Sequence, residues 1–87
     1  MSSLYDIFPK IRTSNTVTTQ LLHTLDELAE VEVEVLDNNR EKILLESIDV
    51  IHSTMTMLNK AGYSKKEIDY AVKQVIKKNA ERGYYEI

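Results

Sequence analysis

Apolar residues recur through most of this 87-residue chain at spacings of three and four residues. This is the period of an α-helix that buries one face. From Thr16 to about Asp37 it predicts a first long helix. Residues 31–35 alternate apolar and charged side chains, as a strand does, but the alternation is short and continues a helical stripe, so we predict helix. The stripe consists of Leu21, Leu22, Leu25, Leu28, Ala29, Val33 and Leu36.

Two more helices are predicted in the second half of the chain. The turn at residues 37–39 contains asparagines, which tolerate the left-handed conformation of a helix C-terminus. The next helix extends from about Arg40 to Lys60 and stops at Gly62. Its apolar stripe has the spacing of a coiled-coil seam and consists of Leu44, Ile48, Ile51, Met55 and Leu58.

A capping box marks the start of the third helix. Ser64 and Glu67 have the required spacing, and the helix is expected to run to about Arg82 and to end at Gly83. Before residue 16 we expect only a short helix near Ser3, with an N-cap for the first long helix among residues 14–16.

These elements predict an all-α fold with three main helices per chain, packed antiparallel. We expect a single domain over residues 1–87, divided into an N-terminal segment (1–15), a helical core (16–82) and a tail (83–87). A domain of this size buries only a modest core, and the apolar residues of 40–60 spread beyond one stripe. We therefore expect oligomerisation, as a homodimer or homotetramer, to complete the bundle.

Composition narrows the class of protein. The apolar fraction of 43% and charged fraction of 29% are typical of a soluble globular domain. The chain has no cysteine, which excludes disulfides and thiolate metal sites. We find no membrane-spanning run and no signal peptide, so the expected location is cytoplasmic with no membrane partner. The net charge of −3 argues against nucleic acid as a partner.

The charges are unevenly distributed. Nine of the fourteen acidic residues lie between Asp26 and Asp49, and six of the eleven basic residues lie between Lys65 and Arg82. One explanation is that solvated helix faces complement each other when packed. The other is that the acidic and basic parts together hold a metal ion and phosphate.

Two acidic pairs carry the most specific chemistry. Glu27 and Glu30 are three residues apart, as are Glu46 and Asp49, so each pair projects from one side of a helix. Four carboxylates aimed into one space repel one another unless a cation lies among them. A ligand set made only of oxygen favours Mg²⁺ or Mn²⁺ over Zn²⁺. The alternative is that these acids are solvated surface charges.

The order of the pairs resembles the signature of the MazG-like all-α nucleoside triphosphate pyrophosphohydrolases. Asp26-Glu27-x-x-Glu30 is followed, after fifteen residues, by Glu46-x-x-Asp49. The resemblance covers about residues 16–85. The local contexts that agree are residues 20–30 for the first motif helix, 46–50 for the second, and 77–84 for the basic end of the last helix.

The resemblance implies a MazG-like helical bundle and an activity. Family members hydrolyse a nucleoside triphosphate or deoxynucleoside triphosphate to the monophosphate and pyrophosphate, by water attack at the α-phosphorus. It implies that Glu27 and Glu30 are catalytic, with Glu30 orienting or deprotonating the water. It also implies Mg²⁺, or Mn²⁺, held by Glu27, Glu30, Glu46 and Asp49, and substrate contacts from His23, Lys78, Asn79 and Arg82.

The chain departs from the family pattern at two positions. Asp26 stands where the motif often has Glu, and His23 stands where related sequences often have Lys. His23 and His52 are also explained as partly buried helix residues. Lys78 and Arg82 are likewise explained as a basic helix end, which is favourable to the helix dipole.

Two other functions fit the same sequence. Residues 46–52 resemble the second motif of phosphoribosyl-ATP pyrophosphohydrolase, although the Lys-Asn-x-Glu-Arg-Gly-Tyr ending at 78–84 favours the MazG-like family. The chain also fits a non-catalytic helical module for dimerisation or protein binding, in which the acids are solubilising charges. No base-recognition pocket can be assigned from the sequence.

Overall fold

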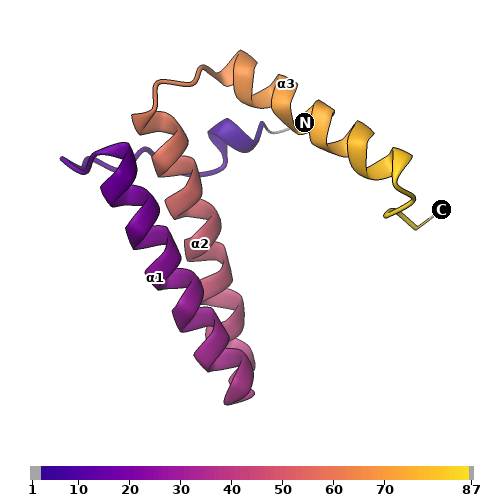
Figure 1. The fold of residues 1–87 in the computed structure, drawn as a ribbon. Helices are drawn as coiled ribbons and strands as arrows, with labels where there is room; N and C mark the ends of the chain where they lie inside the picture. The colour runs from indigo at the N-terminus through magenta and orange to yellow at the C-terminus, as the bar shows by residue number, and fades with distance from the viewer. Residues whose placement is uncertain (1–2, 87) are drawn as a thin grey trace. The chain divides into compact units, whose positions relative to one another are not determined.

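The computed structural model describes residues 3–86, which form an all-α structure with three long helices and no strand within that range (Figure 1). The all-α prediction is confirmed, and residues 31–35 are helical. In chain order the elements are a short 3-10 helix η1 (Leu4–Asp6), α1 (Val17–Leu36), α2 (Arg40–Lys60) and α3 (Lys65–Glu81).

Each long helix begins at a side chain that caps its first turn. The Thr16 hydroxyl accepts a hydrogen bond from the Thr19 N–H, and the Asn39 side chain accepts one from the Lys42 N–H. At α3 the capping box is complete, because Ser64 and Glu67 each bond the other's backbone N–H. Side-chain capping satisfies N–H groups that have no partner within the helix, which is why these positions are visible in the sequence.

The ends of the helices are set by residues in the left-handed conformation. Asn38 has φ +56°, and Gly83 has φ +72°. At α1 the Asn39 N–H reaches the Glu34 carbonyl and the Asn38 N–H reaches the Val35 carbonyl, which is the Schellman arrangement. The asparagine-rich turn after α1 and the glycine stop after α3 were both predicted.

The described residues form two compact units. The hairpin unit comprises residues 10–62, in which α1 and α2 pack side by side and antiparallel (Figure 1). The α3 unit comprises residues 3–9 and 63–86. There η1 packs on α3: the Ser3 hydroxyl donates to the Asp69 carboxylate, and Lys65 pairs with Asp6.

The seam between α1 and α2 is polar at the end that holds the start of α1. Gln20 is only 3% exposed, and its amide is satisfied on both sides. Its Nε2 donates to Ser53 Oγ (2.8 Å) and to the Ser53 carbonyl (3.3 Å), while its Oε1 accepts from Asn15 Nδ2 (2.9 Å). The Thr24 and Ser53 hydroxyls are 2.6 Å apart. Hydrogen bonds therefore replace apolar packing at this point.

The apolar stripes predicted from the sequence do not face each other across this seam. On α1 the least exposed positions recur at 20, 24, 27, 31 and 34, and most leucines lie outside that series. Met55 and Ile68 are the fully buried apolar residues of the described chain. Two helices can cover only one side of each other, so much of the apolar surface is left half-exposed.

Candidate functional site

A cleft of about 370 Å³ lies on the hairpin unit, beside the polar seam. This volume falls in the range of small-molecule sites. Both helices and the segment before α1 contribute to it. Its lining residues are Ile11, Gln20, His23, Glu27, Glu30, Asp49, His52 and Ser53. Three of the four carboxylates singled out in the sequence therefore line one cleft.

Helical spacing places these side chains together. On α1 the lining positions follow one another at three or four residues, from Gln20 through His23 and Glu27 to Glu30. On α2, Asp49 and Ser53 are four residues apart. Side chains at such spacings lie on one side of a helix, and the antiparallel pairing of the helices brings the two rows to the same opening.

His23 and Glu27 form a contact at the cleft wall. His23 Nε2 lies 2.7 Å from Glu27 Oε1, at the i, i+4 spacing of helix neighbours. The Glu27 side chain is 18% exposed, whereas the His23 side chain is 58% exposed. The imidazole therefore lies on the solvent side and holds the more enclosed carboxylate in position.

Glu46 is the fourth carboxylate, and it contacts Glu30 across the two helices. Its pKa is raised by partial desolvation, by a hydrogen bond with the Glu30 side chain, and by the negative charges of Glu30 and Glu34. Lys42 acts in the opposite direction. A positive charge at this place would therefore stabilise the ionised form of Glu46.

The four carboxylates do not converge on one point. Within residues 3–86, no three acidic or histidine side chains are arranged so that they could hold a metal ion. The donor chemistry nevertheless fits Mg²⁺, because every candidate ligand is a carboxylate oxygen.

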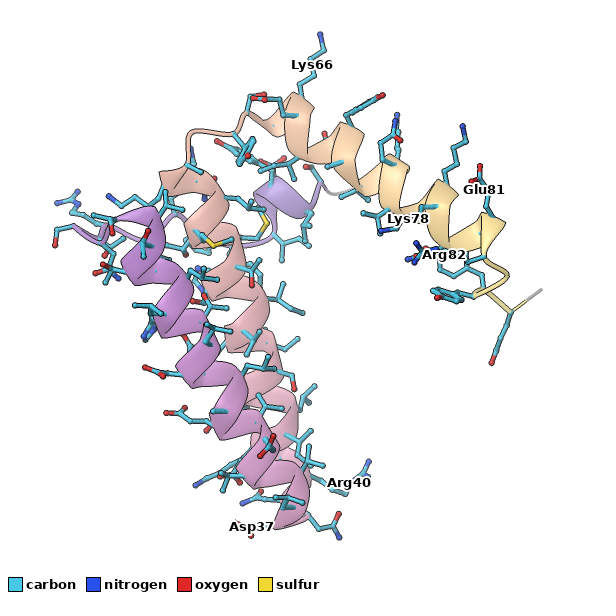
Figure 2. The ribbon with its side chains drawn as sticks, in the orientation of Figure 1. Asp37, Arg40, Lys66, Lys78, Glu81 and Arg82 are labelled. Atoms are coloured by element: carbon cyan, nitrogen blue, oxygen red, sulfur yellow. The ribbon has the colours of Figure 1, made fainter. Side chains whose placement is uncertain are left out.

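The other predicted substrate contacts belong to the α3 unit. Figure 2 shows Lys78 and Arg82 near the C-terminal end of α3. None of Lys78, Asn79 and Arg82 is among the residues that line the cleft. The Asn79 carbonyl accepts from the Tyr84 N–H, and the Ala80 carbonyl accepts from the Gly83 N–H, a second Schellman ending.

This ending explains part of the basic motif without a substrate. Gly83 is required for the positive φ, and Arg82 lies over the Tyr84 ring at 6.0 Å from its centroid. A cation–π contact of this kind is modest when exposed. The helix end therefore explains Gly83 and the contact of Arg82 with Tyr84, whereas the bond from Tyr84 to Asn79 involves only the Asn79 backbone carbonyl.

Three cleft residues were not singled out from the sequence: Ile11, Gln20 and Ser53. Two of them carried a signal. Gln20 lies three residues before His23, and Ser53 lies four residues after Asp49, so both share the helix side of a predicted site residue. Ile11 carried none, because its place depends on how the segment before α1 folds back.

No protein-family model, curated protein or solved structure matches this chain. Among residues 3–86, none of the helices combines the length and apolar character needed to cross a membrane.

Proposed function

We propose that this chain is a Mg²⁺-dependent nucleoside triphosphate pyrophosphohydrolase of the MazG-like type, which releases pyrophosphate from an NTP or dNTP. The observation that carries the proposal is the meeting of both acidic pairs on the hairpin unit. Glu27, Glu30 and Asp49 line one cleft, and Glu46 is hydrogen-bonded to Glu30. Acids that serve only for solubility are expected to spread over a surface, whereas here three lie at one opening and the fourth contacts one of them.

The candidate metal ligands are the four carboxylates of the two acidic pairs. Glu27, Glu30, Glu46 and Asp49 would supply the oxygen ligands of the ion. When bound, Mg²⁺ would neutralise charge on the phosphate oxygens and lower the pKa of a water. His23 would keep Glu27 oriented through the 2.7 Å contact between them.

The chain's own groups then account for water activation. Glu30 would orient the attacking water and accept its proton. It would be aided by Glu27, which lies three residues earlier on α1. A carboxylate in this role must be within hydrogen-bond reach of the water, and both side chains open into the cleft. Lys78, Asn79 and Arg82 remain candidates for phosphate or sugar contacts.

The direct test is a pyrophosphate-release screen of the purified full chain over all NTPs and dNTPs with Mg²⁺, with phosphoribosyl-ATP as a further substrate. We expect release from at least one NTP or dNTP, and loss of release in Glu30→Gln and Asp49→Asn. Glu41→Gln is the matched control, because Glu41 is an exposed acid in the first turn of α2 outside the cleft. Turnover of phosphoribosyl-ATP alone would favour phosphoribosyl-ATP pyrophosphohydrolase instead.

A second candidate function is a non-catalytic association module. The observation that favours it is the number of half-exposed leucine and isoleucine side chains on α1 and α2. The two functions separate in the same screen. No pyrophosphate from any substrate, together with no effect of Mg²⁺ or Mn²⁺ on thermal stability, would leave the association module as the better explanation.

A further inference from the structure

Gln20 joins the two helices of the hairpin unit beside the cleft through both polar atoms of its side chain. Its Nε2 donates to Ser53 Oγ at 2.8 Å and to the Ser53 carbonyl at 3.3 Å, and its Oε1 accepts from Asn15 Nδ2 at 2.9 Å. Two bonds to one residue of α2 restrict both the sliding and the turning of α1 against α2, because either movement takes at least one bond beyond hydrogen-bond distance.

This contact belongs to a ring of hydrogen bonds that includes Thr24, one turn further along α1. The Thr24 hydroxyl donates to the Gln20 carbonyl at 2.9 Å, which uses its single hydrogen. Ser53 is therefore the donor across the 2.6 Å contact between the Thr24 and Ser53 hydroxyls. We call Gln20, Thr24 and Ser53 the Gln20 ring, since the bonds close through the backbone of Gln20.

The Gln20 ring lies at the cleft, but its donors are already used. Gln20 and Ser53 line the cleft and are 3% and 4% exposed. The amide of Gln20 donates to Ser53, and the hydroxyl of Ser53 donates to Thr24. These side chains therefore have no spare donor for a phosphate or a sugar, and they act on the cleft through the placement of the two helices.

The acids of the cleft follow directly along the same seam. Glu27 lies three residues after Thr24 on α1, and Asp49 lies four residues before Ser53 on α2, so each is roughly one turn, about 5.4 Å, beyond the ring. Because α1 and α2 are antiparallel (Figure 1), the two steps lead in the same direction. The ring therefore sets the register at which these two carboxylates face the cleft.

The acids themselves do not hold this register. Glu30 and Glu46 contact each other across the two helices, and like charges at such a place push the helices apart. A slide of one residue moves a side chain about 1.5 Å along the helix axis and turns it about 100°. Metal ligands must lie within about 0.2 Å of their usual distances, so a slide of this size removes a carboxylate from a shared ion.

We propose that Gln20 is a positioning residue: its bonds to Ser53 hold α1 and α2 in the register at which the two acidic pairs meet. The inference rests on the proposed function, because the acidic pairs are the proposed metal ligands. Gln20 would act on metal affinity by preorganisation, since ligands that are already in place need no rearrangement when the ion binds.

The first test is the Kd of the full chain for Mg²⁺, measured by titration calorimetry. Gln20→Met keeps the volume and removes the bonds to Ser53 and Asn15, so Kd should rise roughly tenfold, as is typical when a residue that orients metal ligands is lost. Ser53→Ala covers the case in which Gln20→Met fails to fold. Its effect should be smaller, because Gln20 Nε2 keeps its bond to the backbone carbonyl of residue 53.

Thr16→Ala is the matched control. The Thr16 hydroxyl bonds the N–H and the hydroxyl of Thr19 in the first turn of α1, so its loss weakens the same end of the hairpin without releasing α2. We expect its Kd for Mg²⁺ to stay within about twofold of the wild-type value. An equal rise in Thr16→Ala, or an unchanged Kd in both Gln20→Met and Ser53→Ala, would overturn the proposal.

A second measurement reports the register without metal. The chain has no cysteine, so spin labels can be attached at two introduced thiols. Thr18→Cys and Glu41→Cys are exposed and lie toward opposite ends of the antiparallel pair, so a slide of α1 along α2 changes the distance between the labels. In EDTA, pulsed EPR should give a narrow distance distribution that Gln20→Met broadens or displaces. An identical distribution would overturn the proposal.

The outcomes for the reaction and for Gln20 are separable. A wild-type chain that binds Mg²⁺ and loses affinity in Gln20→Met, but releases no pyrophosphate, would contradict the proposed reaction and support the positioning role. Pyrophosphate release by the wild-type chain, with the same Kd and the same label distances in Gln20→Met, would support the reaction and overturn the role of Gln20.

Discussion

The Glu46 side chain on α2 is hydrogen-bonded to the Glu30 side chain on α1. This one contact joins the two acidic pairs, which are separated by fifteen residues in the sequence. It also creates a local electrostatic cost, because partial desolvation and the negative charge of Glu30 disfavour the ionised form of Glu46.

The first prediction concerns this cost. Since the folded-state pKa of Glu46 is raised above its ordinary value of 4.5, its ionisation opposes folding. The protein should lose stability as pH rises from about 4.5 through the raised pKa. Glu46→Gln should lose less over the same range. The measurement is the Tm of both proteins in EDTA from pH 4.5 to 7.5, and parallel curves would contradict the expectation.

The second prediction concerns stability with Mg²⁺ present, where the carboxylates should raise the stability of the folded chain instead of lowering it. If Mg²⁺ binds the four carboxylates, it binds the folded chain and stabilises it by mass action. At a concentration ten times its Kd the gain is roughly 1.4 kcal/mol, which corresponds to about 5–10 °C in Tm for a domain of this size. Glu46→Gln, Glu30→Gln and Asp49→Asn should each lose most of this shift.

The control for the metal experiment is Glu41→Gln, which removes one exposed negative charge from the same helix as Glu46. It should keep the full Mg²⁺ shift. An equal loss in Glu41→Gln would show that Mg²⁺ responds to the overall negative charge rather than to these four residues.

The helices could be predicted from the sequence because their signals are local. The capping box of Ser64 and Glu67 marks the start of α3, and the left-handed Asn38 marks the end of α1. Both signals depend on interactions within a few residues. The position of Glu27 beside Glu30 is equally local. The cleft as a set of side chains was only partly predictable, because Ile11 reaches it through the fold of the segment before α1.

The direction of the leucine stripe could not be predicted for a different reason. A period of three and four residues shows that a helix has an apolar side, but it does not say which neighbour covers that side. In the hairpin unit, Gln20 and Thr24 of α1 contact Ser53 of α2, whereas Leu25 stays half-exposed. The polar residues of the seam could not be recognised in the sequence, because the apolar pattern next to them is stronger.

The third prediction concerns the start of α3. The backbone and side chain of Ser64 hold the pKa of Glu67 below its ordinary value. This contribution to stability is therefore present above pH 4.5 and is lost as pH falls through the lowered pKa. Ser64→Ala should cost about 1 kcal/mol at pH 7 and should reduce the acid sensitivity of α3. Amide hydrogen exchange in residues 65–70 measures both effects, and Ser14→Ala, an exposed serine outside the helices, is the control.

The last prediction concerns the buried amide that joins the cleft wall to the helix seam. Gln20 bonds Ser53 on α2 and Asn15 before α1, and it is 3% exposed. Gln20→Ala leaves both partners without these bonds in a place that water reaches poorly, which should cost about 2 kcal/mol of unfolding free energy. Gln20→Met restores the volume but not the hydrogen bonds, so it should recover less than half of the loss. Urea unfolding measures both. Gln74→Ala, at an exposed position of α3, should change the free energy by less than about 0.5 kcal/mol. Full recovery in Gln20→Met would show that packing, and not the amide, stabilises this end of the hairpin.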